Sequence, residues 1–252
     1  MTNILKVTDL KKSFGHLVAL DGVSLSVDER TVSILIGPNG SGKTTLINVI
    51  TGFHHPDSGK VEFKSADITG WQPHELYNIG IARTFQIPSL FWKLTVLENL
   101  LVAEKKNPGE SFTKSLFRRF WEPQEEAAAE KAAKILETLG LSNHANDPAY
   151  KLSGGQMKLL EMGRALMSDA KLLLLDEPVS GVNPTLAHEI FSKIIKLRDE
   201  SGVSFLIVEH RLDIAMGYVD HMNAMALGKL IASGRPNEVV GHPKVVEAYL
   251  GK

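Results

Sequence analysis

Short apolar runs alternate with segments of helical periodicity along most of this chain. The most apolar runs span residues 33–36, 172–175 and 205–208, and each has the length of a buried strand. The segments 43–51 and 184–200 carry apolar residues at helical spacing. Strands that alternate with helices are typical of an α/β fold. We therefore predict an α/β fold built on a mostly parallel sheet.

The first part of the chain departs from this rhythm. Residues 5–7 and 23–27 are strand-like, and turn signals at Phe14-Gly15-His16 and Asp21-Gly22 separate such segments. Strands joined by short turns pair in the antiparallel sense. We predict an N-terminal antiparallel β lobe, which residues 60–64 continue.

The middle of the chain, residues 95–140, is predicted to be helical. Residues 96–101 present one apolar face, and residues 125–140 are strong helix formers. Asn107-Pro108-Gly109 interrupts this region, so we expect a helical insertion made of several pieces. The predicted organisation is a single domain with two parts: a core with the β lobe, residues 1–85 and 170–252, and a helical subdomain, about residues 86–169.

Composition narrows the function classes. The chain has 252 residues, a formal net charge of −1 and no cysteine, which excludes disulfides, zinc–thiolate sites and thiol nucleophiles. A near-neutral chain has no general attraction to nucleic acid, so we expect no nucleic-acid partner. No apolar run approaches the roughly 18 residues of a membrane span, and the N-terminus does not resemble a signal peptide. We expect a cytoplasmic protein that reaches a membrane only through partners.

A glycine-rich loop follows the first buried strand and precedes a helix. Its sequence fits the G-x-x-x-x-G-K-[ST] pattern, in which backbone N–H groups and a helix N-terminus surround phosphate. Lys43 is expected to reach the β- and γ-phosphates, and Thr44 is expected to ligate Mg²⁺. A chance glycine-rich turn would not be expected between a strand and a helix. The loop residues are Gly37, Pro38, Asn39, Gly40, Ser41, Gly42, Lys43 and Thr44.

Two acids end the next strand that the pattern predicts, 172–176. Ligands collect at the carboxyl ends of parallel strands, so Asp176 is placed to hold Mg²⁺ and Glu177 to accept a proton from an attacking water. An Asp-Glu pair after an apolar strand more often opens a helix, but the phosphate loop upstream favours the catalytic reading. His210 follows a third strand, and we expect it to bond the γ-phosphate and position the water.

A second glycine turn lies in the helical subdomain. Ser153, Gly154, Gly155 and Gln156 precede a predicted helix, 157–167, and expose N–H groups at its start. One fold cannot easily direct two such helix starts at one nucleotide. Two copies arranged head-to-tail can, because each offers its Ser153 loop to the other's ATP.

At this point the sequence resembles the ATP-binding-cassette (ABC) ATPases over nearly its whole length. Five motifs match in order: the phosphate loop, Gln86 in RTFQIP, LSGGQ, LLLLDEP and His210. The resemblance implies a P-loop NTPase core that binds and hydrolyses ATP with Mg²⁺ as a dimer. It implies that Gln86 contacts Mg²⁺ or the water and couples the site to a transporter subunit.

The same resemblance assigns further residues. Phe14 is expected to stack on adenine, Val18 to line the same pocket, and Thr45 to complete the nucleotide site. The segment 180–184 corresponds to the dimer-crossing loop of the family, in which Asn183 replaces the usual aspartate.

Within the family, the chain is most similar to ATPase subunits of branched-chain amino-acid uptake systems. The segments TVLENLLVAE, LSGGQMKLLEMGRALM, VEHRLDIAM and PKVVEAYLGK carry this likeness. It implies transmembrane permease partners, a second ATPase subunit that is either identical or a sister protein, and a position on the inner face of the membrane. A lipid or lipopolysaccharide exporter would look nearly the same and stays open as an alternative.

Other ABC classes fit less well. A chromosome-structuring or DNA-repair ATPase would place a long coiled coil between Lys43 and Ser153, where this chain has room for one lobe. A translation-associated member would carry two cassettes in one chain.

The segment 111–121 combines basic and aromatic residues at helical spacing. The plainer interpretation is the core of the helical lobe with a solvated charged side. The alternative is a surface that meets the transporter subunit or lipid headgroups.

Overall fold

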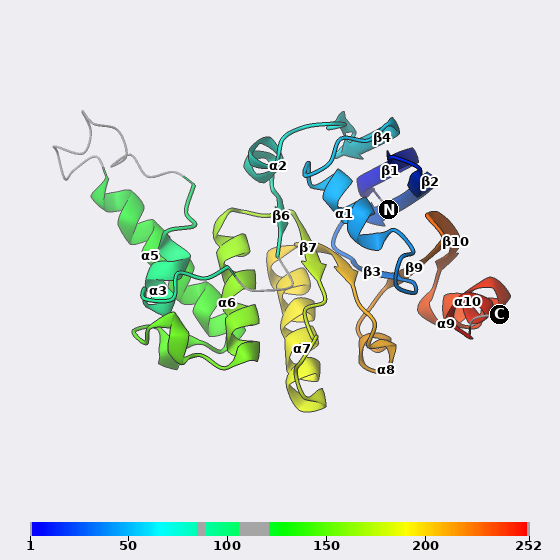
Figure 1. Cartoon of the computed structure of the whole chain (residues 1–252). Coiled ribbons are helices and arrows are strands. Elements are labelled where there is room, and N and C mark those ends of the chain that lie inside the picture. Colours follow the sequence, from blue (N-terminus) through cyan, green and yellow to red (C-terminus); the bar gives the residue numbers. More distant parts are fainter. Residues whose placement is uncertain (1, 85–88, 106–120, 251–252) are drawn as a thin grey trace. The chain divides into compact units, whose positions relative to one another are not determined.

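The computed structural model describes residues 2–84, 89–105 and 121–250 (Figure 1). Contacts divide the chain into two compact units. The first unit is Met1–Gln86 with Lys171–Lys252, and the second unit is Ile87–Ala170. Each unit has its own apolar interior and is described by itself.

A six-stranded sheet forms the centre of the first unit. Its order is β10-β9-β3-β8-β7-β6, and all neighbouring pairs are parallel except β10 with β9. Every residue of β3 and β8 is buried, as the continuous apolar runs of the sequence require. The prediction of an α/β fold with a mostly parallel sheet is confirmed. The strands are β3 (Val32–Ile36), β6 (Ile81–Arg83), β7 (Leu172–Asp176), β8 (Ser204–Val208), β9 (His221–Ala226) and β10 (Lys229–Gly234).

The N-terminal β lobe is an antiparallel sheet in the order β2-β1-β4-β5. Its strands are β1 (Asn3–Phe14), β2 (Leu17–Asp28), β4 (Ser58–Phe63) and β5 (Ala66–Asp67). The turn predicted at Asp21-Gly22 is wrong, because β2 runs through it. The register passes from Leu10↔Val23 to Lys11↔Asp21, so Gly22 is the extra residue of a bulge.

Helices flank these sheets in the first unit. They are α1 (Lys43–Ile50), α2 (Pro73–Ile79), α7 (Pro184–Ser201), α8 (Leu212–Ala215), α9 (Pro236–Val240) and α10 (Pro243–Leu250). The helix predicted at 184–200 is present as α7, and Asn183 caps it by accepting the N–H of Leu186. The sequence did not predict α2, α9 or α10. The last two lie beside β10 at the edge of the large sheet (Figure 1).

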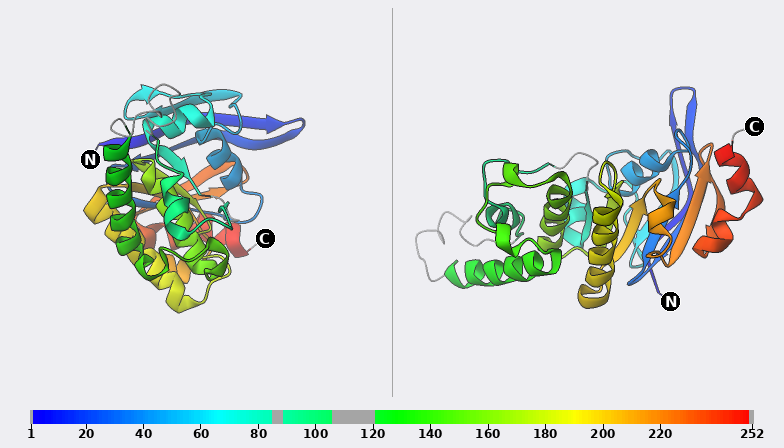
Figure 2. Two further views of the ribbon diagram at one scale, coloured as in Figure 1. Left: turned by 90° about the vertical axis from the view of Figure 1, so that its left-hand side faces the viewer. Right: turned by 90° about the horizontal axis from the view of Figure 1, so that it is seen from below.

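The second unit packs α3 (Val96–Leu101), α5 (Glu122–Leu139) and α6 (Gly154–Met167) together (Figure 2). They meet at Gly163, where an added Cβ would lie 3.0 Å from side-chain atoms of both Leu100 and Leu139. No helix in residues 2–84, 89–105 or 121–250 is long and apolar enough to cross a membrane. Of the basic and aromatic segment 111–121, only Trp121 lies within the described residues.

The close approach at Gly163 predicts the effect of a larger side chain. Gly163→Leu should lower the free energy of unfolding by roughly 1–3 kcal/mol, because overpacking forces neighbouring side chains off their rotamers. Urea unfolding followed by circular dichroism measures this. Gly217→Leu is the matched control, since no atom lies within 4 Å of a Cβ added there. Equal loss in both variants would contradict tight packing at Gly163.

Candidate functional site

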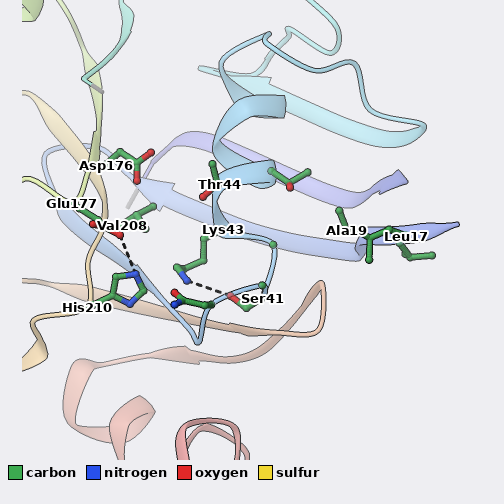
Figure 3. A pocket seen from close by; sticks show the side chains of 14 residues that line it. Leu17, Ala19, Ser41, Lys43, Thr44, Asp176, Glu177, Val208 and His210 are labelled. Carbon is green, nitrogen blue, oxygen red and sulfur yellow. Dashed lines mark hydrogen bonds and ion pairs between the residues drawn. The ribbon is translucent and has the colours of Figure 1, made fainter. Parts of the chain in front are cut away.

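Three neighbouring parallel strands bring the predicted site residues of the first unit to one sheet edge. β8 lies between β3 and β7 in the sheet. The phosphate loop follows β3, His210 follows β8, and Asp176 ends β7. Since the strands run in the same direction, their carboxyl ends meet, and this is where open α/β sheets bind ligands. Figure 3 shows these side chains around one pocket.

The pocket has a volume of about 260 Å³. It brings together most of the residues predicted to bind nucleotide, but Gly37, Pro38 and Phe14 do not line it. Three of its lining residues, Leu17, Ala19 and Val208, were not predicted as part of the site. The lining residues are Leu17, Val18, Ala19, Asn39, Gly40, Ser41, Gly42, Lys43, Thr44, Thr45, Asp176, Glu177, Val208 and His210.

The loop requires glycine at two of its positions. Gly37 has a φ of 153°, and a Cβ there would collide with the carbonyl oxygen of Met225 on β9. Gly42 has a φ of 101°, and a Cβ there would lie 2.5 Å from the carbonyl oxygen of Ala19. Both the backbone conformation and the lack of space therefore exclude a side chain.

Lys43 is folded back onto its own loop. Its Nζ donates to the carbonyl oxygens of Gly37 at 2.8 Å and of Pro38 at 3.0 Å. Burial lowers the pKa of Lys43 below its ordinary value, and the nearby carboxylates of Glu177 and Asp176 act in the opposite direction. The loop thus holds a buried cation at the edge of the pocket.

Glu177 and His210 lie beside each other among the residues that line the pocket. His210 Nε2 lies 3.2 Å from Glu177 Oε1 (Figure 3). Glu177 has a φ of 50°, a conformation that few residues with side chains adopt, and its N–H donates to the carbonyl of Val208. The end of β8 therefore holds the strained backbone of Glu177 in place. Such strain is concentrated at functional sites.

Arg83 is a site residue that the sequence reasoning missed. It lies at the end of β6, and its guanidinium binds Asp176 Oδ2 at 2.9 Å and Asn48 Oδ1 at 2.5 Å. The Arg83 and Asp176 side chains are only 8% and 14% exposed, so each provides the charge that the other needs when buried. Arg83 belongs to the RTFQIP motif, which had been interpreted through Gln86 alone.

Glu209 is the second missed residue. It is 1% exposed and accepts backbone N–H groups on both sides of the site. Its Oε1 accepts from Val179 at 3.0 Å, while Oε2 accepts from His210 at 2.8 Å and Arg211 at 3.1 Å. Glu209 therefore ties the loop after Glu177 to the loop that carries His210. A glutamate directly after the apolar run 205–208 was the available signal.

The predicted adenine contacts are exposed. Val18 lines the pocket and is 54% exposed. The Phe14 ring is outside the pocket, 43% exposed, and in edge contact with His54 at a centroid distance of 5.1 Å. Lys12 Nζ lies 5.5 Å from the centroid of the same ring. Of the two residues predicted to contact adenine, Val18 lines this pocket and Phe14 does not.

The Ser153 loop belongs to the second unit. Ser153 accepts the N–H of Gln156, and the Gln156 side chain accepts the N–H of Ser153, which together form a capping box at the start of α6. The helix begins at Gly154, earlier than the predicted residue 157. Gln86 lies outside the described residues.

The contacts of Glu209 predict the effect of removing its charge. Glu209→Gln keeps the shape, but its amide nitrogen would face an N–H donor, so at least one buried N–H loses its acceptor. The free energy of unfolding should fall by about 1–3 kcal/mol. Urea unfolding measures it, with Glu189→Gln on the exposed side of α7 as the matched control. A midpoint unchanged in both variants would contradict the three-bond arrangement.

Comparison with known proteins gives consistent matches. The family described as "ABC transporter" matches residues 20–180, and that described as "Branched-chain amino acid ATP-binding cassette transporter" matches residues 229–252. A probable branched-chain amino acid transport ATP-binding protein, LivG, of Methanocaldococcus jannaschii is 53% identical; the match covers 99% of this chain and 98% of the relative. The high-affinity protein BraF of Pseudomonas aeruginosa is 39% identical with the same coverage.

Solved structures agree with these relatives. The crystal structure of the ADP conformation of an ATP-binding cassette of an ABC transporter has a TM-score of 0.86 and 51% identity, and covers 100% of both chains. A dimeric post-hydrolysis cassette bound to ADP and Pi has a TM-score of 0.73 and 26% identity, covering 92% of this chain and 98% of that one. The chain therefore belongs to the ABC transporter family, as an ATP-hydrolysing ATP-binding subunit.

Proposed function

We propose that this chain powers the uptake of branched-chain amino acids by hydrolysing ATP for partner membrane subunits. The support is a likeness that spans the whole chain to proteins named for this transport. The single observation that carries the catalytic part is the pocket in which the phosphate loop, Asp176, Glu177 and His210 meet.

ATP phosphates fit the start of α1. The helix cap is Gly42, in a left-handed conformation and without a side-chain cap. The helix dipole and the first-turn N–H groups therefore favour an anion there. Lys43 would exchange its bonds to the carbonyls of Gly37 and Pro38 for bonds to the β- and γ-phosphates. The cation already lies in the loop, close to where the phosphates would bind.

The residues present suit Mg²⁺. No group of three or more His, Cys, Asp or Glu residues within the described part of the chain could hold a metal. Mg²⁺ commonly uses one or two protein oxygens together with substrate phosphates and water. Thr44 and Asp176 provide a hydroxyl and a carboxylate in the pocket. When bound there, the ion would offset negative charge on the phosphates.

Glu177 is the proposed general base. Its carboxylate would accept a proton from the water that attacks the γ-phosphate, and the phosphate–oxygen bond to ADP would break. His210 lies beside it, at 3.2 Å, and would hold the water and the γ-phosphate in line. Glu209 accepts the backbone N–H of His210 and would thereby help to keep the His210 ring at this distance from Glu177.

A second subunit would complete the site. The Ser153 loop opens α6 with two exposed residues, Ser153 and Gly154, and this helix start suits the γ-phosphate of a nucleotide held by another cassette. The dimeric relative bound to ADP and Pi supports this assembly. Gln86 would couple the site to transmembrane permease subunits, through which the chain attaches to the inner face of the membrane.

Glu177→Gln tests the catalytic assignment. The change keeps the shape but removes the proton acceptor, so turnover should fall by about 10²–10⁴-fold while ATP affinity stays within about twofold. Phosphate release and fluorescent-ATP binding measure the two quantities. Glu189→Gln on α7 is the matched control and should hydrolyse ATP normally. Normal turnover in Glu177→Gln would remove Glu177 as the base.

Uptake of labelled leucine tests the cargo. The subunit is co-expressed with the permeases and binding protein of a branched-chain amino-acid uptake system, in cells lacking their own branched-chain uptake. Wild-type chain should restore uptake, and Lys43→Ala should abolish it, because the phosphates lose their cation. Restored ATP hydrolysis without leucine uptake would reject the cargo and leave the ATPase assignment intact.

A further inference from the structure

The C-terminal segment contacts the phosphate loop. Helix α10 carries Tyr249, and the N–H of Gly37 donates to the Tyr249 hydroxyl at 2.8 Å. Gly37 is the first residue of the loop, and Tyr249 lies far from it in sequence. The segment PKVVEAYLGK carries part of the family likeness, and no sequence motif gives Tyr249 a role.

Gly37 is the point at which the loop leaves β3. Glycine has the greatest backbone freedom of all residues, so a glycine at this position must be held by its neighbours. Its N–H is held by Tyr249, and its carbonyl oxygen accepts from Lys43 at 2.8 Å. Both polar groups of this residue are thus fixed, one by the C-terminal helix and one by the cation that is proposed to bind phosphate.

Tyr249 is itself anchored. The neighbouring helix residues Val239 of α9 and Val245 of α10 are 2% and 3% exposed, so both helices are docked by buried side chains. Tyr249 is 44% exposed, and burial of the remainder raises the pKa of its hydroxyl above the ordinary value. The group therefore stays protonated near neutral pH and accepts the Gly37 N–H as a neutral oxygen.

The hairpin before α9 makes a second contact. Gly228, in the turn between β9 and β10, donates its N–H to the carbonyl oxygen of Ser41 at 3.0 Å. Its own carbonyl accepts the N–H of Asp21 at 2.8 Å. The phosphate loop is therefore held at its first residue by α10 and in its middle by this hairpin.

We propose that Tyr249 is a positioning residue for the phosphate loop, through which the docked C-terminal helix raises the affinity for nucleotide. It acts by holding Gly37 in the backbone conformation from which the following N–H groups face phosphate. This rests on the proposed nucleotide site at residues 37–44. By linkage, bound nucleotide stabilises the docking of α10 to the same extent.

Tyr249→Phe tests this with the smallest change. It removes the hydroxyl and keeps the ring, so α10 should remain docked and the unfolding midpoint should change little. The Kd for ATP should rise about 2- to 12-fold, the range that the net value of one hydrogen bond corresponds to. The kcat at saturating Mg-ATP should stay within about twofold, because Tyr249 does not touch the reacting atoms.

Amide exchange reports the bond directly. In nucleotide-free protein, NMR-detected exchange of the Gly37 amide should be faster in Tyr249→Phe than in the wild type. In the wild type, added ATP should slow the exchange of α10 amides. The matched control is Tyr218→Phe, which also removes a bonded hydroxyl. The Tyr218 hydroxyl lies 3.0 Å from His188 Nδ1, and neither residue belongs to the phosphate loop. It should leave both ATP affinity and Gly37 exchange unchanged.

The outcomes separate this proposal from the nucleotide site on which it rests. Faster Gly37 exchange together with a raised Kd supports it. Unchanged Gly37 exchange, or an unchanged Kd despite faster exchange, overturns it. If wild-type chain and Lys43→Ala bind ATP equally well, the nucleotide site itself is wrong, whatever Tyr249→Phe does.

Discussion

The parallel pairing of β3, β8 and β7 is the constraint on which the site depends. Because the three strands run in one direction, the phosphate loop, His210 and Asp176 reach the same edge of the sheet although they are far apart in sequence. A shift of one residue in β8 would turn its side chains to the opposite faces and carry His210 away from Glu177. The full burial of β3 and β8 opposes any such shift.

Backbone groups hold the charges at this edge. The Glu209 carboxylate accepts three backbone N–H groups. The Lys43 ammonium group donates to two loop carbonyls. These donors and acceptors lie in the loops that follow β3, β7 and β8, and each strand fixes the point at which its loop begins. Oriented dipoles of this kind stabilise developing charge without the cost of reorganisation. Asp176 differs, because a side chain, Arg83, balances it.

Features that a short run of sequence specifies were predictable. The apolar strands, the phosphate loop and the acids at the end of β7 each lie within a few residues. Features that depend on distant partners were not. The bulge at Gly22 is visible only in the pairing with β1. The role of Glu209 depends on the N–H of Val179, a residue that is distant in sequence. The same holds for Tyr249, whose partner is near the other end of the chain.

These long-range contacts bear on the affinity of the phosphate loop for nucleotide. In the proposed binding of phosphate, Lys43 would give up two carbonyl acceptors, so part of the new interaction would only replace an old one. The net gain then depends on the loop N–H groups, which must already face the ligand. The conformation of Gly37 is held by its bond to Tyr249 on α10 and by the close approach of the Met225 carbonyl on β9. On this proposal, affinity for nucleotide is a property of the whole first unit, and the phosphate-loop sequence alone would not determine it.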